Sequence, residues 1–186
     1  MKRAAIFLAD GFEEIEALTV VDILRRGGVE ITMCSVMDRH MVHGSHGIDV
    51  TADCMYGETE TAGLDMLVLP GGKAGTEFLE QYEPLLEALK AFYQQRKYIA
   101  AICAAPRIFG KLGFLENREA TAYPTFEGML TGAQVVRKPA VVSGHVITGR
   151  SMGTAIPFAL ALLEMLEGRE TAERIRKEIV YKEICE

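Results

Sequence analysis

One cysteine stands where a chain can place a reactive thiol. Cys103 lies in the run AAICAAP over residues 100–106, between small residues at the end of an apolar segment that predicts a strand. Pro106 suits the first turn of a following helix. Small neighbours permit the sharp turn of a nucleophile elbow, and the helix N-terminus stabilises an anion, so we expect a lowered thiol pKa. The alternative is a buried, inert cysteine.

A second turn offers backbone hydrogen-bond donors. Residues 69–72 read LPGG, directly after an apolar run. Gly71 and Gly72 leave their N–H groups unobstructed by side chains, as an oxyanion hole requires. A plain tight turn has the same pattern.

A third turn carries three acids, in the run GFEEIE over residues 11–16. Carboxylates at a helix start are favoured by the helix dipole, which is sufficient to explain Glu13 and Glu14. Glu16 lies between two apolar residues and can point into a crevice. A carboxyl group buried beside a thiolate has a raised pKa and acts as a proton donor.

These turns belong to an alternation of strands and helices. Apolar runs predict strands at 4–8, 29–36, 64–69 and 98–102. Helical spacing or composition predicts helices at 17–24, 76–95, 105–112, 154–166 and 172–182. This order predicts an α/β fold, a flavodoxin-like, doubly wound and mainly parallel sheet with helices on both faces, in a single domain over residues 1–186. In such a sheet the three turns meet at one crevice.

Other segments are less regular. Residues 38–63 predict a hairpin or an edge excursion, and Pro84 is best placed at the first turn of a new helical piece. Shorter β-like runs occur at 120–123, 135–136 and 140–148. His145, in the sequence SGHV, is predicted at a hairpin turn.

Composition excludes several classes of function. The chain has 186 residues, 49% of them apolar, and a formal charge of -6 with lysine and arginine scattered, so no nucleic-acid partner is expected. The apolar stretch 4–9 is too short for a signal peptide or a membrane span. We therefore expect a cytosolic protein without a membrane partner.

The positions of the cysteines and histidines do not predict a metal site. The four cysteines form no C-x-x-C pair, and Cys34, Cys54 and Cys185 are interpreted as two strand or edge positions and a tail thiol. Histidines at every third position from His40 to His46 invite a metal hypothesis, but no helix is predicted there and no further ligand completes the set. We expect neither a metal nor a cofactor.

Taken together, four motifs resemble the ThiJ/PfpI superfamily, in the branch of the parkinsonism-associated deglycase and the bacterial YajL-type proteins. They are GFEEIE at 11–16, LPGG at 69–72, AAICAAP at 100–106, and the ending from ITGR at 147–150 to FALA at 158–161. The resemblance covers nearly the whole chain, and four motifs in one order are more specific than any single motif.

The resemblance implies roles for these residues. Cys103 would be the family's oxidisable nucleophile, and Glu16 the protonated glutamate that hydrogen-bonds it. Gly71, Gly72 and Ala104 would line the oxyanion or substrate site, with backbone N–H groups supplied by Gly72 and Ala104.

It also implies a homodimer. Asp22, Arg25 and Arg26 would lie near its interface, unless they form a solvated helix face, and His46 would occupy the position of an interface arginine. Tyr123 stands where some relatives carry a histidine, which removes the obvious general base but leaves Tyr123 beside the substrate. The turn at 151–152 departs from the family's Gly-Pro.

Two functions follow from the resemblance. The first is a cysteine-dependent, glutathione-independent glyoxalase or deglycase that acts on methylglyoxal-type dicarbonyls or their adducts, with a Cys103 hemithioacetal and Glu16 as acid and base. The second is an oxidative-stress sensor or redox-regulated chaperone, in which Cys103 becomes a sulfinate held by Glu16. A non-catalytic scaffold is a third possibility, and the intact Glu16, Gly72 and Cys103 argue against it.

Overall fold

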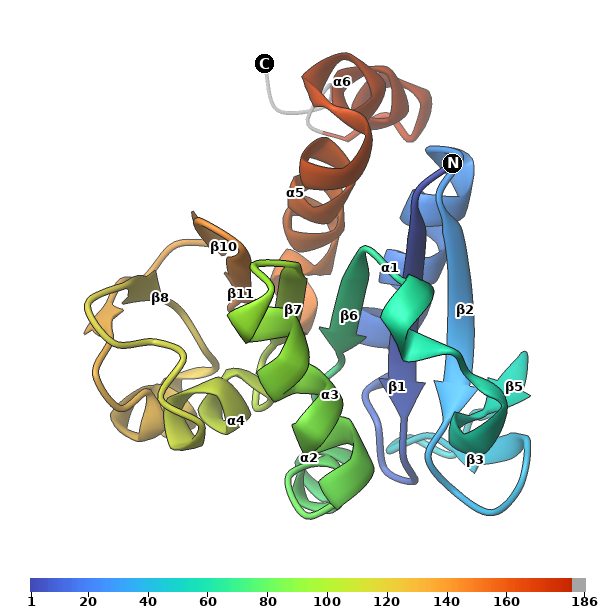
Figure 1. Cartoon of the computed structure of the whole chain (residues 1–186). Coiled ribbons are helices and arrows are strands. Elements are labelled where there is room, and N and C mark those ends of the chain that lie inside the picture. Colours follow the sequence, from blue (N-terminus) through green and yellow to red (C-terminus); the bar gives the residue numbers. More distant parts are fainter. Residues whose placement is uncertain (182–186) are drawn as a thin grey trace.

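A seven-stranded sheet runs through the centre of the computed structural model, which describes residues 1–181 (Figure 1). Its strands are β1 (Arg3–Leu8), β2 (Glu30–Ser35), β5 (Cys54–Met55), β6 (Met66–Leu69), β7 (Tyr98–Ile102), β10 (Ala140–Ser143) and β11 (Val146–Gly149). They pair in the order β10-β11-β7-β6-β1-β2-β5, and every pair is parallel except β10 with β11. The predicted doubly wound, mainly parallel sheet is confirmed.

Helices cover both faces of this sheet, as predicted. The helices of the described residues are α1 (Glu14–Arg26), α2 (Lys73–Leu79), α3 (Glu83–Gln94), α4 (Pro106–Lys111), α5 (Ala155–Glu167) and α6 (Arg169–Glu178). One apolar core lies between the sheet and α1 and α5, with α6 packed on α5 beyond the sheet, and a second lies between the sheet and α2, α3 and α4 (Figure 1). The end of α1 packs closely on α5, because Gly27 has no side chain: a Cβ there would lie 2.2 Å from Leu163 Cδ1.

The central strands are buried on both faces, which explains their unbroken apolar sequences. In β1 every residue from Ala4 to Leu8 has an exposed fraction of 0%. The turns after β1, β6 and β7, which carry the candidate site residues, therefore follow rigid strands rather than long loops.

Two predicted elements are divided in the structure. The single helix predicted at 76–95 is two helices, α2 and α3, with α2 already beginning at Lys73 and Pro84 in the first turn of α3 as predicted. The β run at 140–148 is an antiparallel hairpin of β10 and β11, turned at Gly144 and His145, which confirms the predicted place of His145.

The segment 38–63 contains both predicted alternatives, a hairpin and an edge strand. The hairpin is β3 (Met41–His43) with β4 (Asp49–Thr51), the edge strand is β5, and two short 3-10 turns follow, η1 (Tyr56–Glu58) and η2 (Thr61–Gly63). Further 3-10 turns are η3 (Pro124–Met129) and η4 (Met152–Thr154).

The predicted strand at 120–123 is shorter than expected. Only β8 (Glu119–Ala120) is a strand, paired with β9 (Gln134–Val135) in a separate small sheet. The next residues turn toward the main sheet because Thr121 N–H donates to Thr148 Oγ1 at 3.0 Å and Tyr123 N–H donates to the Cys103 carbonyl at 2.9 Å.

None of the helices within residues 1–181 combines the length and the hydropathy that crossing a bilayer requires. The predicted tail at 172–182 corresponds largely to α6. Lys182 and Cys185 lie outside the described residues.

Candidate active site

Cys103 occupies the turn between β7 and α4 with a left-handed backbone, at φ +66°. Residues other than glycine rarely adopt this conformation, which costs roughly 1–3 kcal/mol and occurs preferentially at functional sites. Its N–H donates to the Gly149 carbonyl at the end of the neighbouring strand β11, at 3.0 Å. The strained turn matches the nucleophile elbow expected from the small residues around Cys103, and the side chain is only partly buried.

Glu16 approaches this cysteine from the first turn of α1. The residue has an exposed fraction of 0%, and its Oε2 accepts the backbone N–H of Gly71 at 2.9 Å. A Cβ on Gly71 would lie 2.4 Å from Glu16 Oε2 and 2.7 Å from Cys103 Cβ, so the glycine is required for their approach. The three turns predicted to converge do so.

The environment of Glu16 favours the protonated acid. Burial raises its pKa from 4.5 to about 7, against the opposing effects of hydrogen bonds with Cys103 and with the Gly71 N–H. Among residues 1–181 its second oxygen, Oε1, is buried without a hydrogen-bond partner that satisfies normal geometry. The site therefore holds a carboxyl oxygen free to exchange a proton.

The thiol differs from the expectation of a lowered pKa. Burial raises the pKa of Cys103 first, and the charge and hydrogen bond of Glu16 raise it further, whereas the N–H groups of Ala104 and Gly72 lower it. The effect of Glu16 depends on its own charge, because a protonated carboxyl donates to the sulfur and stabilises the thiolate. The two groups therefore share one negative charge, and only one of them ionises readily.

The predicted backbone donors lie near the Cys103 sulfur, and their part in an oxyanion site stays a prediction. The N–H groups of Gly72 and Ala104 both act on the Cys103 sulfur. Gly72 has φ +89°, and a Cβ there would lie 2.2 Å from the Gly11 carbonyl oxygen. Only glycine fits this position, so the donor geometry depends on a residue without a side chain.

Tyr123 contacts Cys103 through its backbone. Its side chain is 43% exposed and lies beside Phe126, with ring centroids 6.4 Å apart. Within residues 1–181 its hydroxyl has no hydrogen-bond partner. A substrate contact by the Tyr123 ring stays a prediction.

Two contributions were missed from the sequence. The backbone of Met152, in the turn that departs from Gly-Pro, lies close enough to Glu16 to oppose the rise of its pKa. The β3–β4 hairpin also docks on the first turn, because Gly11 N–H donates to the His43 carbonyl at 2.7 Å and Ser45 N–H to the Phe12 carbonyl at 2.9 Å. Neither contact has a signal in local sequence, since both depend on tertiary packing.

His46 is paired with the acids at the start of α1. Its Nδ1 lies 3.0 Å from Glu14 Oε2 and 3.5 Å from Glu13 Oε2, which raises the pKa of His46 through the hydrogen bond to Glu14. Burial alone would raise the pKa of Glu14, but hydrogen bonds from His46 and Ser45 lower it to about 2. Glu13, Glu14 and His46 are close enough to share a cation, yet their contacts are those of an ion pair.

The other residues considered for metal or dimer roles have separate partners. His43 pairs with Asp49 at 2.7 Å, and His40 lies 3.9 Å from Glu58, so the three histidines do not converge. Arg26 pairs with Asp22 within α1, and Arg25 reaches Asp53 at 2.8 Å. The two ion pairs are exposed, as on a solvated helix face.

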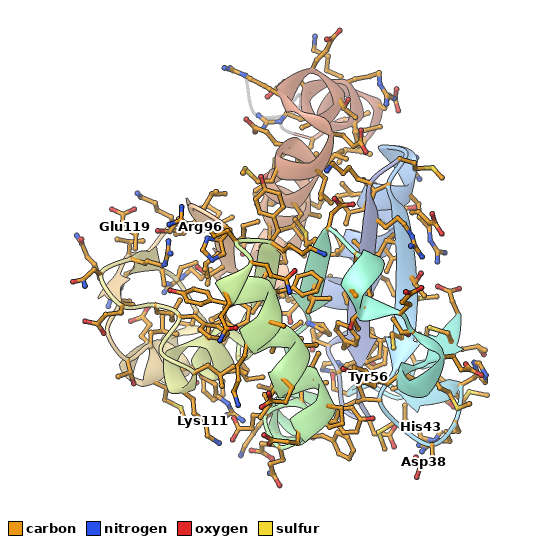
Figure 2. All side chains as sticks on the ribbon, viewed as in Figure 1. Asp38, His43, Tyr56, Arg96, Lys111 and Glu119 are labelled. Atoms are coloured by element: carbon orange, nitrogen blue, oxygen red, sulfur yellow. The ribbon has the colours of Figure 1, made fainter. Side chains whose placement is uncertain are left out.

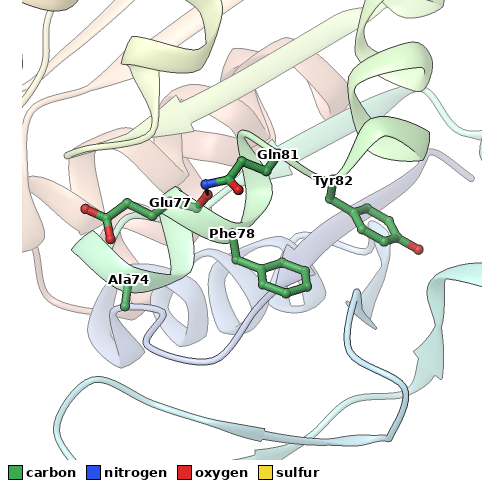
Figure 3. A pocket seen from close by; sticks show the side chains of 5 residues that line it. All are labelled: Ala74, Glu77, Phe78, Gln81 and Tyr82. Atoms are coloured by element: carbon green, nitrogen blue, oxygen red, sulfur yellow. Dashed lines mark hydrogen bonds between the residues drawn. The ribbon is translucent and has the colours of Figure 1, made fainter.

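A cavity of about 340 Å³ lies on α2, away from this site. Ala74, Glu77, Phe78, Gln81 and Tyr82 line it, and neither Cys103 nor Glu16 is among them (Figure 3). The rings of Phe78 and Tyr82 stack with centroids 6.1 Å apart. Its lining combines apolar rings with the polar side chains of Glu77 and Gln81 and contains no thiol.

The fold and this turn define a class: α/β proteins with a cysteine at a nucleophile elbow and a buried glutamate beside it. The sequence model of the DJ-1/PfpI family matches residues 2–165, and the chain belongs to this family.

Individual relatives agree with this assignment. The chain is 36% identical over 183 residues to Protein DJ-1 homolog B of Arabidopsis thaliana, across 97% of this chain and 42% of that protein, so it spans less than half of that relative. It is 30% identical over 167 residues to a protein of Pyrococcus abyssi named a deglycase, across 89% and 99% of the two chains. A structure of Toxoplasma gondii DJ-1, described as oxidized, superposes with a TM-score of 0.94 at 34% identity and covers 98% and 100% of the two chains.

Proposed function

We propose that the chain is a cysteine-dependent enzyme of the glyoxalase or deglycase type, which acts on methylglyoxal-like dicarbonyls or their adducts without glutathione. The observation that carries the proposal is the contact of Cys103, Glu16 and Gly71, in which a strained thiol lies beside a buried acid whose pKa is about 7. A group with a pKa near neutrality exchanges protons efficiently in both directions. The Pyrococcus abyssi relative named a deglycase supports the same assignment.

The residues suggest a sequence of steps. The Cys103 thiolate attacks the aldehyde carbon, and the oxygen of the resulting hemithioacetal is stabilised by the N–H groups of Gly72 and Ala104. Glu16 takes the proton from that carbon and returns it to the neighbouring carbon, which converts the hemithioacetal into a thioester of the hydroxy acid. Water then cleaves the thioester, releasing the hydroxy acid and the free thiol. The net reaction adds one water to the dicarbonyl.

The test is lactate formation from methylglyoxal in the absence of glutathione. We expect turnover by the wild type and loss of about 100-fold or more with Cys103→Ala and with Glu16→Ala, because general acid–base catalysis alone contributes that much. Cys54→Ala is the matched control, since it removes a partly exposed thiol outside the site. No turnover by the wild type would reject the proposal.

A second candidate is an oxidation sensor. Hydrogen peroxide would convert the Cys103 thiol to a sulfinate, with two peroxide oxygens transferred and two waters released, and the protonated Glu16 would donate a hydrogen bond to the product. The relative from Toxoplasma gondii whose structure is described as oxidized supports this candidate. A stable sulfinate on Cys103 in a protein without dicarbonyl turnover would favour the sensor over the enzyme.

We also propose a cytosolic homodimer that uses the exposed face of α1. Ile15 and Leu18 are 51% and 37% exposed on this helix, next to the acids that bind His46. Burying such apolar side chains between two copies is favourable. Sedimentation velocity of the wild type and of Ile15→Glu would test it, and a wild-type monomer would exclude it.

A further inference from the structure

Two cysteines outside the Cys103 site face each other across adjacent strands. Cys34 in β2 and Cys54 in the parallel strand β5 are direct register partners. Both side chains lie on the sheet face that packs against α2, α3 and α4. Cys34 is fully buried and Cys54 is partly exposed. Neither thiol has a role in the chemistry proposed for Cys103.

One hydroxyl brings the two sulfurs together. Thr59 Oγ1 lies 3.2 Å from Cys34 Sγ and 3.1 Å from Cys54 Sγ. The same hydroxyl donates to the Met55 carbonyl at 3.2 Å, which uses its only hydrogen. Its oxygen can therefore accept from both thiols, and Cys34 Sγ also lies 4.0 Å from the Ser35 carbonyl oxygen as a second acceptor.

The backbone geometry permits a bond between the sulfurs. In-register residues on neighbouring strands have Cα atoms about 4.8 Å apart, which is inside the range of roughly 4.4 to 6.8 Å found for disulfides. β5 has two residues and pairs with β2 alone, at the edge of the sheet. A short edge strand held on one side can make the small movement that closes an S–S bond.

Cys54, the outer thiol, is partly exposed and lies next to a residue that lines a surface cavity. A cavity of about 300 Å³ opens beside the ends of β2 and β5, and its lining includes Val36, Met55, Tyr56 and Tyr82. Tyr56 lies at the end of the sheet where β2 ends (Figure 2). Val36 and Met55 are within two residues of the cysteines, so an oxidant in this cavity is close to Cys54.

We propose that Cys34 and Cys54 are a dithiol modification site, which a small disulfide oxidant converts to an intramolecular disulfide independently of Cys103. Cys54, as thiolate, attacks one sulfur of the oxidant and releases one small thiol, forming a mixed disulfide. Cys34, as thiolate, then attacks the Cys54 sulfur and releases the second small thiol. Two electrons pass from the protein to the S–S bond of the oxidant, and the two protons end on the two released thiols.

The second step is the slow one. Burial raises the pKa of Cys34 to about 12, so little of it is thiolate at neutral pH. Closure of the mixed disulfide should therefore accelerate by nearly tenfold for each rise of one pH unit between about 7 and 9.

The disulfide would constrain the segment between β2 and β5. It closes the segment 34–54, which contains the β3–β4 hairpin that docks through His43 and Ser45 on the turn before α1. A covalent link across this segment constrains the unfolded chain, so oxidation should raise the thermal midpoint.

The experiment uses the full chain with Cys103→Ala and Cys185→Ser, so that Cys34 and Cys54 are the only thiols. After incubation with oxidised glutathione, we expect both thiols to be lost, the mass to fall by two hydrogen atoms, and digestion without reductant to yield a Cys34–Cys54 linked peptide. Dithiothreitol should restore both thiols. Cys34→Ser in this background should stop at the glutathione adduct on Cys54, and Cys54→Ser should take up no glutathione.

Other products would overturn the proposal. They are two free thiols after long incubation, glutathione adducts on both residues, or links between chains. Peptide mapping of the unmutated protein after the same treatment provides a second measurement that needs no variant to fold. A wild type that carries Cys34 and Cys54 in separate adducts would reject the site as clearly as the variants.

Discussion

Gly71 donates its backbone N–H to Oε2 of Glu16 at 2.9 Å, and no other residue type would fit between that carboxyl group and Cys103. The bond fixes the orientation of Glu16 whether or not the acid is ionised. The carboxyl group is therefore held in one orientation beside Cys103. The reactivity of Cys103 should depend on the chemistry of its neighbour more than on its own exposure.

Substitution of Glu16 tests this dependence. Glu16→Gln keeps a hydrogen-bond donor beside the sulfur, whereas Glu16→Leu replaces it with an apolar group of similar size. Because a hydrogen bond to a charged group contributes about 1.5–3 kcal/mol, Cys103 of the Leu variant should be alkylated by iodoacetamide at least about tenfold more slowly at pH 7 than that of the Gln variant. The rate is measured on the Cys103 peptide by mass spectrometry. Equal rates would show that the carboxyl group does not stabilise the thiolate.

The pH dependence of stability should report the same acid. The pKa of Glu16 is raised in the folded state from 4.5 to about 7, so its contribution to stability is complete below pH 4.5 and is lost as the pH rises through 7. The shift corresponds to roughly 3 kcal/mol. In Glu16→Gln this loss should disappear, and urea unfolding at pH 5 and pH 8 should show the variant gaining stability relative to the wild type at the higher pH. A constant difference would contradict the raised pKa.

The contribution of Glu14 to stability should depend on pH in the opposite direction. Its pKa is lowered in the folded state to about 2, so its contribution is present above pH 4.5 and is lost as the pH falls toward 2. Glu14→Gln should flatten the acid limb of the stability curve, measured by urea midpoints from pH 5 to pH 2.5. Glu77→Gln, at an exposed position of α2 without an ion pair among residues 1–181, is the control and should leave the limb unchanged.

Substitution of two glycines distinguishes the energetic cost of backbone strain from the cost of a steric clash. Gly28 and Gly72 both have positive φ, at +84° and +89°, but only Gly72 has atoms where a Cβ would lie. Gly28→Ala should cost about 1–2 kcal/mol from conformation alone. Gly72→Ala should cost at least about 3 kcal/mol, because the Gly11 and Glu13 backbones must also move. Similar urea midpoints for the two variants would show that the turn is looser than the structure indicates.

The sheet, its helices and the meeting of three turns could be predicted from periodicity and from the rule that parallel strands end at one edge. Cys103 and Gly72 could be placed this way, because they lie in the turns after β7 and β6, whereas Glu16 lies inside α1 and Ala104 was indicated only by the family resemblance. The division of 76–95 into two helices was less visible, since only Pro84 marks it. Local patterns also predicted a strand at 120–123 that the structure does not have. There, hydrogen bonds to Thr148 and Cys103 replace the pairing of a strand.

Charge and proton affinity were the hardest properties to predict. The turn at Cys103 suggests a lowered pKa, but the opposing effects of burial and of Glu16 depend on side-chain positions that sequence does not give. The pairing of His46 with Glu14 has the same cause: the hairpin and α1 are separated in the chain and meet only after packing. The register of Cys34 with Cys54 likewise depends on which strand occupies the edge of the sheet.

The left-handed turn of Cys103 is held by Gly149, which belongs to a strand near the other end of the chain from Glu16. A nascent or partly refolded chain can complete β1, β6 and β7 and still lack the strand that holds this turn. Until β11 joins the sheet, the turn at Cys103 lacks the hydrogen bond to Gly149 that holds its left-handed backbone. During refolding, the recovery of the native reactivity of the Cys103 thiol would therefore report when β11 pairs with β7. An intermediate without β11 would not show that native reactivity.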